Sequence, residues 1–217
     1  MRVDLANEFS FRAPQVRRTP LAMSTDFAPH SATAVRDAFT QAFEGVRVLR
    51  DAKLMQPCLV VLYSAIDAAA WMAAEHDGDV TKSDFLSWVD RFLLPESKLD
   101  CTAFDLYGAR CGVLHSFSAY SSLQRQGKAR LVCYVWGAAT VADLQERLKH
   151  LPPDSAVAVH IDDLANALIR GWERCLLSLE SKPDAVQRLA HRASHLFSSV
   201  RPDPVTGALA NVREMKG

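Results

Sequence analysis

The sequence predicts a mainly α protein, a helical bundle with a small two-stranded β insertion. Along most of the chain, apolar residues recur at the i, i+3, i+4 and i+7 positions that place them on one face of a helix. Two short runs rich in β-branched and aromatic residues interrupt this pattern in the second half. The length of 217 residues suits one domain with terminal tails.

The first half of the chain carries four predicted helices. The first covers residues 35–49, where the helical spacing of apolar residues is strongest. The second covers residues 57–75 and is apolar almost all round, so we expect it in the middle of the bundle. Residues 81–95 begin with a threonine followed by an aspartate three positions later, a helix-start signal, and end at a proline. The fourth helix runs over residues 102–115.

The second half mixes the two kinds of element. Residues 131–136 and 156–160 are predicted strands, which we expect to pair as a small ribbon beside the bundle. Between them, residues 141–151 form a short predicted helix that two prolines end. A long amphipathic helix over residues 161–179 and a last one over residues 183–200 complete the prediction.

The predicted helical domain spans residues 31–200. Residues 1–30 mix arginine, proline, serine and threonine without a period, and we expect a flexible arm there and a flexible tail over residues 201–217. The arm lacks the apolar core of a signal peptide. Residues 59–74 are short for a membrane span and carry Asp67 at their centre, so they indicate a buried helix and no membrane association.

Composition limits the functions that the chain can serve. Its 25 basic and 25 acidic residues cancel, so no global field attracts nucleic acid and RNA binding requires a local patch. Arg125, Lys128 and Arg130 are the candidate RNA-binding cations.

The cysteines indicate a reducing environment. They are odd in number and scattered without a Cys-x-x-Cys pair, which argues against a disulfide framework or a zinc site and fits the cytoplasm (Cys58, Cys101, Cys111, Cys133 and Cys175). The chain also lacks a glycine-rich phosphate loop and a Ser-His-Asp order, so we expect neither a metal nor another cofactor.

Arg110 and His115 form the most informative motif. A permanent cation beside a group that titrates near neutrality is the minimum needed to act on a phosphodiester. On an ideal helix, residues five apart diverge by about 140°. We therefore expect the helix to end or bend between them, and Gly112 allows such a bend.

The spacing Arg-x4-His near the end of an apolar helix resembles the HEPN superfamily. This superfamily comprises all-α domains and includes many prokaryotic ribonuclease toxins with an Arg-x(4–6)-His motif. The resemblance implies a metal-independent endoribonuclease with Arg110 and His115 as catalytic residues, in a toxin or phage-defence setting. It also implies a homodimer that brings two motifs together, and an antitoxin partner such as a nucleotidyltransferase-like protein.

The chain departs from this family pattern in two places. The residue after the arginine is commonly polar in the family and is Cys111 here. A tyrosine often stands two residues after the histidine, where this chain has Phe117, and the nearest tyrosine is Tyr120. The alternative interpretation is a non-catalytic HEPN-like module that binds a partner or small ligand, in which Arg110 ties down a carboxylate and His115 is an ordinary helix-end histidine.

Asp67 is the expected partner of Arg110. An ionised carboxylate in so apolar a helix is costly unless it is paired, and Arg110 is an equally isolated charge. Asp105, on the same predicted helix as Arg110, is the competing partner. The pair can serve to orient the guanidinium for chemistry or can be a plain buried salt bridge.

Two other arrangements carry less weight. His191 and His195 have the i, i+4 spacing that can bind a metal from one helix face, but no third ligand lies nearby in the sequence, which favours a solvated face. Cys111 can be read as a nucleophile beside His115, or as a packed core thiol on an apolar helix, and the second interpretation is favoured.

Overall fold

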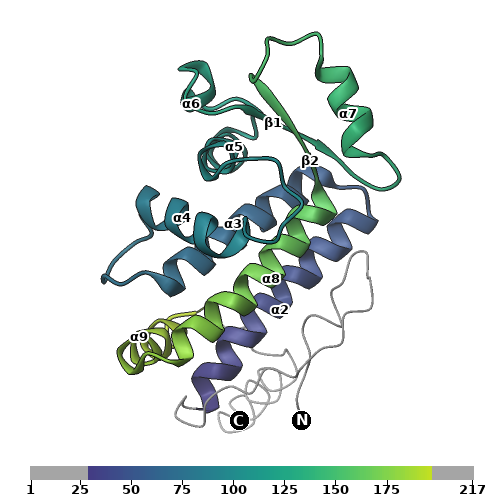
Figure 1. Ribbon diagram of the computed structural model, residues 1–217. Coiled ribbons are helices and arrows are strands. Elements are labelled where there is room, and N and C mark those ends of the chain that lie inside the picture. Colours follow the sequence, from purple (N-terminus) through teal and green to yellow (C-terminus); the bar gives the residue numbers. More distant parts are fainter. Residues whose placement is uncertain (1–28, 197–217) are drawn as a thin grey trace, which may run out of the picture.

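Helix α3 (Met55–Ala73) is the central element of a mainly α fold. The computed structural model describes residues 29–196, so the expected tail and nearly all of the expected arm lie outside the described residues. Five helices pack against α3 and form the bundle: α2 (Pro29–Asp51), α4 (Lys82–Trp88), α5 (Ala103–Ser116), α8 (Ile161–Glu180) and α9 (Pro183–Ala193). The predicted class, a helical bundle with a small two-stranded sheet, is confirmed (Figure 1).

Two helix ends differ from the prediction. Helix α2 begins at Pro29, so residues 29 and 30 belong to it and not to the arm. Helix α9 ends at Ala193, because residues 194–196 turn more tightly, with each of their amides donating to the carbonyl three residues back. The expectation of a helix up to residue 200 is therefore wrong over residues 194–196, and residues 197–200 lie outside the described range.

The third predicted helix is divided in two. The capping box predicted at its start is present, but after α4 the chain widens into a π-helical segment, η1 (Val89–Leu93). Arg174 of α8 donates to the carbonyls of Phe92 and Pro95 at its end, satisfying groups that the wide turn leaves free. Gly171 allows this approach, since a Cβ there would lie 2.8 Å from the Phe92 carbonyl oxygen.

The two strands form a parallel pair, not a hairpin ribbon. Strand β1 (Leu131–Val135) pairs in register with β2 (Ala156–His160), and α7 (Val141–Leu148) provides the crossover that parallel strands require. Figure 1 shows this β1–α7–β2 unit at one end of the bundle, with α9 at the other. Strand β2 runs directly into α8, and His160 caps that helix by accepting from the Asp162 amide.

A pair of buried hydroxyls joins the sheet to the central helix. The hydroxyl oxygens of Tyr63 on α3 and Tyr134 on β1 lie 2.5 Å apart, so one donates to the other. Burial raises the pKa of both phenols, which keeps both hydroxyls protonated. This bond links the β1–α7–β2 unit to α3 four residues before Asp67.

Arg192 of α9 completes the other end of α3. Its guanidinium donates to the carbonyl of Met72 in the last turn of α3 and to those of Ala74 and His76 just beyond the helix. Within residues 29–196, α3 is the one helix long and apolar enough to cross a membrane, and half of that stretch is buried inside the protein. Its place among five other helices is that of a core helix.

Candidate functional site

Helices α3 and α5 bring Asp67 and Arg110 together, so the predicted contact is confirmed. Arg110 donates to Oδ2 of Asp67 from Nε at 2.8 Å and from Nη2 at 2.7 Å. The two side chains are 16% and 19% exposed, so one edge of the pair faces solvent. The apolar run around Asp67 buries its helix, and the ion pair is what that burial demands.

The same guanidinium reaches His115. Its Nη1 lies 3.0 Å from Nε2 of the imidazole. An arginine N–H can only donate, so Nε2 of His115 is the acceptor in this hydrogen bond. Arg110 thus links a carboxylate on one helix to an exposed histidine on another turn of its own helix.

The helix does not end between the two motif residues, so that half of the expectation is wrong. Helix α5 continues through both, and the arginine side chain is long enough to cross the gap. The last turn is also widened, since the amide of Phe117 donates to Gly112, five residues back. Gly112 admits the returning chain, because a Cβ there would lie 2.4 Å from the Ser118 carbonyl oxygen.

Burial and pairing act against each other at this site. Burial raises the pKa of the Asp67 carboxyl, and the hydrogen bonds from Arg110 oppose part of that rise. Burial also acts to lower the pKa of Arg110, but Asp67 outweighs it and the net shift is upward. The guanidinium is therefore a fixed cation. The Asp67 carboxylate holds it in one orientation, although the pairing does not fully offset the cost of burying that carboxylate.

Tyr107 and Cys111 lie beside the pair on α5. Burial raises the pKa of Tyr107, and the thiol of Cys111, one turn further on, raises it again. Cys111 is half-buried, as expected of a packed thiol more than of an accessible nucleophile.

Asp105 belongs to the fold and does not compete for Arg110. It accepts from the backbone amides of Thr102 and Arg130, and from Arg130 Nε and Nη2 at 3.0 and 2.8 Å. Burial acts to raise the pKa of Asp105, but these hydrogen bonds outweigh it and hold the pKa below its ordinary range. Arg130, proposed from sequence as an RNA contact, is thereby engaged in joining α5 to the start of β1.

The other two candidate cations lie away from Arg110. Arg125, at the end of α6 (Ser122–Arg125), and Lys128 are exposed, and within residues 29–196 neither forms an ion pair. Helix α6 lies against Gly108, where a Cβ would come within 2.7 Å of the Gln124 side chain. Arg110, two residues on, projects about 200° away from that face. Figure 1 shows α6 beyond α5 as seen from α3.

Phe117, near the motif, has a contact that the sequence did not suggest, and Tyr120 does not reach the motif. Phe117 ends α5 in the left-handed conformation, and its carbonyl accepts from Gln56 Nε2 at 3.2 Å. In the sequence, the only sign of this contact was the position of a phenylalanine two residues after His115. Tyr120 is 53% exposed, and its side chain makes no hydrogen bond to Arg110 or His115 among the described residues.

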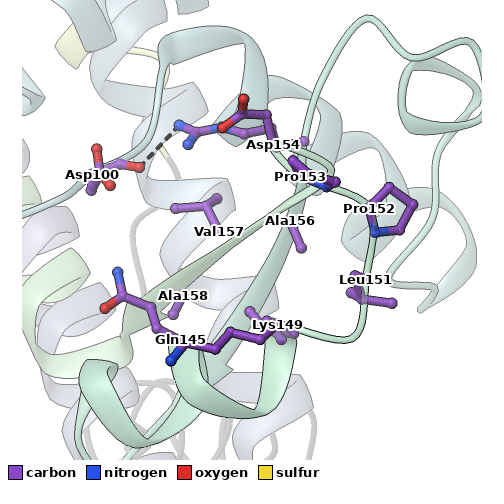
Figure 2. A pocket seen from close by; sticks show the side chains of 12 residues that line it. Asp100, Gln145, Lys149, Leu151, Pro152, Pro153, Asp154, Ala156, Val157 and Ala158 are labelled. Carbon is purple, nitrogen blue, oxygen red and sulfur yellow. Dashed lines mark hydrogen bonds between the residues drawn. The ribbon is translucent and has the colours of Figure 1, made fainter.

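A separate pocket of about 380 Å³ lies between the sheet and α7. Asp100, Arg130, Gln145, Lys149 and Asp154 supply its polar lining, and Figure 2 shows the hydrogen bond at 2.9 Å from Arg130 to the Asp100 carbonyl. None of the motif residues lines it. The motif is a partly exposed cluster on the bundle surface, not the floor of this cavity.

Within the part of the chain that the structure describes, no three potential metal ligands gather into one group. The rings of His191 and His195 contact each other edge to face at 4.9 Å, but His195 lies beyond the end of α9. This fits the interpretation of the pair as a solvated surface.

Comparison with protein-family models, with curated proteins and with solved structures finds no match for this chain. The arrangement of Asp67, Arg110 and His115 is therefore the feature of the molecule that points to a function.

Proposed function

We propose that the protein is a metal-independent endoribonuclease of the HEPN-like type, acting in the cytoplasm. The observation that carries the proposal is the contact between Arg110 Nη1 and His115 Nε2, with Asp67 fixing the guanidinium from behind. A neutral imidazole nitrogen beside a fixed cation can serve as the base and the charge-stabilising group of a phosphodiester cleavage.

The residues divide the work as follows. RNA binding replaces the Arg110–His115 hydrogen bond, and Nε2 of His115 then takes the proton of the ribose 2′-hydroxyl. The 2′ oxygen attacks phosphorus, the bond to the 5′ oxygen breaks, and a cyclic phosphate forms. Arg110 has five N–H groups, of which Asp67 takes two, so three are available to the phosphoryl oxygens once RNA has replaced the hydrogen bond to His115.

The leaving 5′ oxygen needs a proton from a second group. Among the described residues, the cluster around Arg110 holds one histidine. A homodimer that brings two motifs together supplies the second. A toxin or phage-defence role with an antitoxin partner, such as a nucleotidyltransferase-like protein, follows from the same family resemblance.

The second candidate function is a non-catalytic HEPN-like module that binds a partner or small ligand. Two observations favour it: Asp67 cancels the charge of Arg110, and Arg125 and Lys128 lie on the opposite side of α5. Both leave the motif with a weak attraction for phosphate.

RNA cleavage in EDTA separates the two functions. We expect the wild-type protein to cut single-stranded RNA and to leave single-stranded DNA intact, because only RNA carries its own nucleophile. His115→Ala should lower the rate by about 10²–10⁴. His150→Ala is the matched control, since His150 is also exposed just beyond a helix and should not affect the rate. Identical RNA products from wild type and His115→Ala would reject the nuclease and favour the binding module.

A further inference from the structure

We infer that Phe117 is a stacking platform for an unpaired base of single-stranded RNA, next to the phosphate held by Arg110 and His115. The inference rests on the proposed function for its ligand, but it assigns a binding role to a residue outside the Arg-x4-His motif. Three observations carry it: the exposure of the ring, the backbone conformation of the residue, and its place beside the motif.

The ring of Phe117 is left in solvent. The residue is 68% exposed, the largest value among the large apolar residues that the structure describes. Among residues 29–196, no other aromatic ring and no cation lies over the Phe117 ring. The Phe104 ring, on the same helix, has the Lys82 ammonium 4.4 Å from its centroid. The fold therefore gains little hydrophobic stabilisation from this phenylalanine.

The backbone at Phe117 favours a different residue. Its φ of 48° and ψ of 32° lie in the left-handed region, which glycine adopts freely and a bulky side chain adopts at a cost. The conformation is nevertheless held on both sides of the residue. The Phe117 amide donates a hydrogen bond to the Gly112 carbonyl, and the Phe117 carbonyl accepts one from Gln56. A strained and exposed aromatic residue that burial does not explain indicates a ligand.

The position of Phe117 identifies that ligand. It follows His115 by two residues, and the bond from Gln56 holds it close to the start of α3. An exposed aromatic face beside groups that bind phosphate is the arrangement with which proteins hold unpaired bases. A base inside a duplex has both faces covered by its neighbours, so the ring selects single strands.

The test measures binding in a His115→Ala background, where the RNA stays intact. A short single-stranded RNA carrying 2-aminopurine reports stacking by fluorescence quenching and affinity by titration. Phe117→Gly should weaken binding about ten-fold and abolish the quenching. The same substitution should leave the Tm unchanged or raise it, because glycine relieves the left-handed strain. Phe117→Trp should restore both signals, and Phe104→Ala is the control for loss of an exposed phenylalanine.

The outcomes distinguish this inference from the nuclease proposal. Stacking without cleavage by the wild type supports the base platform and rejects the nuclease. Equal affinity and quenching in the Phe117 and Phe104 variants reject the platform, whether or not the wild type cleaves RNA. A Phe117→Gly protein that binds RNA normally but loses self-association would assign the ring to a contact between copies of the chain, and would also overturn the inference. Phe117→Asn, which tolerates the left-handed backbone without an aromatic ring, repeats each measurement independently.

Discussion

Asp67 of α3 holds Arg110 of α5 through a single carboxylate oxygen, Oδ2, which accepts from both Nε and Nη2. The pair favours the charged form of Arg110 but not that of Asp67, because burial still raises the pKa of Asp67. A carboxylate whose charged form is disfavoured by folding is placed there for the orientation of its partner more than for stability.

The pKa of Asp105, on α5 like Arg110, is lowered where that of Asp67 is raised. Replacing each aspartate by a neutral residue should therefore change the free energy of unfolding by different amounts. We predict that Asp105→Asn lowers the free energy of unfolding by about 3 kcal/mol, since it leaves Arg130 without its charge partner in a buried setting. Asp67→Asn should cost about 1 kcal/mol, because asparagine resembles the neutral acid that burial favours and still accepts a hydrogen bond. Urea unfolding followed by circular dichroism measures both.

Asp143 provides the matched control for that comparison. It has the same capping-box position on α7 as Asp105 has on α5. Unlike Asp105, it is exposed and accepts no hydrogen bond from an arginine among the described residues. Asp143→Asn should therefore cost less than Asp105→Asn. A larger loss from Asp67→Asn than from Asp105→Asn would show that the Asp67–Arg110 pair is the main structural bond of α5.

The pH dependence of stability should reflect Asp105. Its folded-state pKa is lowered, so its contribution is fully present above the unfolded-state pKa of about 4. That contribution is lost as the pH falls through the lower folded-state value. Asp67 acts with the opposite sign, because its raised pKa makes the folded state relatively more stable in acid.

Urea midpoints measured through the acid range check this assignment. Wild type should lose stability as the pH falls below about 4, and Asp105→Asn should show a shallower loss. Parallel curves for the two proteins would place the acid-sensitive group elsewhere.

Arg192 should be a strong stabilising residue although it lies far from the motif. Arg192→Met leaves the carbonyls of Met72, Ala74 and His76 without donors, and we expect a loss of about 3 kcal/mol. Arg170→Met, at an exposed position of α8, controls for the loss of an arginine and should have almost no effect. An equal fall in Tm for Arg192→Met and Arg170→Met would refute the capping role of Arg192.

Gly112 should be required for the end of α5, whereas Gly108 on the same helix should not. Gly112→Ala places a Cβ 2.4 Å from a backbone oxygen, which forces the Ser118 segment away and should cost about 2 kcal/mol. Gly108→Ala meets the side-chain end of Gln124 and, at 3.1 Å, the Cβ of Ala129, neither of which is backbone, and the gain in helix propensity should keep the change within about 1 kcal/mol. Equal urea midpoints for the two variants would show that the exit loop adapts freely.

Local signals in the sequence predict much of this fold. Apolar periodicity located the helices that lay one face against the core, such as α2 and α8, and the threonine–aspartate spacing marked the start of α4. The Asp67–Arg110 contact was predictable because each residue was otherwise an isolated charge in an apolar helix. This reasoning needs no knowledge of distant packing.

The unpredicted features depend on how distant elements meet. Arg192 caps α3 across 120 residues, and Arg130 reaches Asp105 only because β1 starts beside the first turn of α5. The expected end of the helix between Arg110 and His115 was wrong because ideal helix geometry omits the length of the arginine side chain and the widened last turn.

The chemistry of the cut ends tests the nuclease account most directly. The wild-type protein, incubated in EDTA with an end-labelled single-stranded RNA, should produce fragments that end in a 2′,3′-cyclic phosphate. A single 2′-deoxy substitution at a cleaved nucleotide should block the cut at that position, because the 2′-hydroxyl is the nucleophile. Arg110→Lys should slow the same cut, since lysine keeps the charge but lacks the planar guanidinium that bonds Asp67 through two N–H groups and presents the others to phosphate. Cleavage that persists at the deoxy position, or fragments that end in a 3′-hydroxyl, would contradict the proposed role of His115 and Arg110.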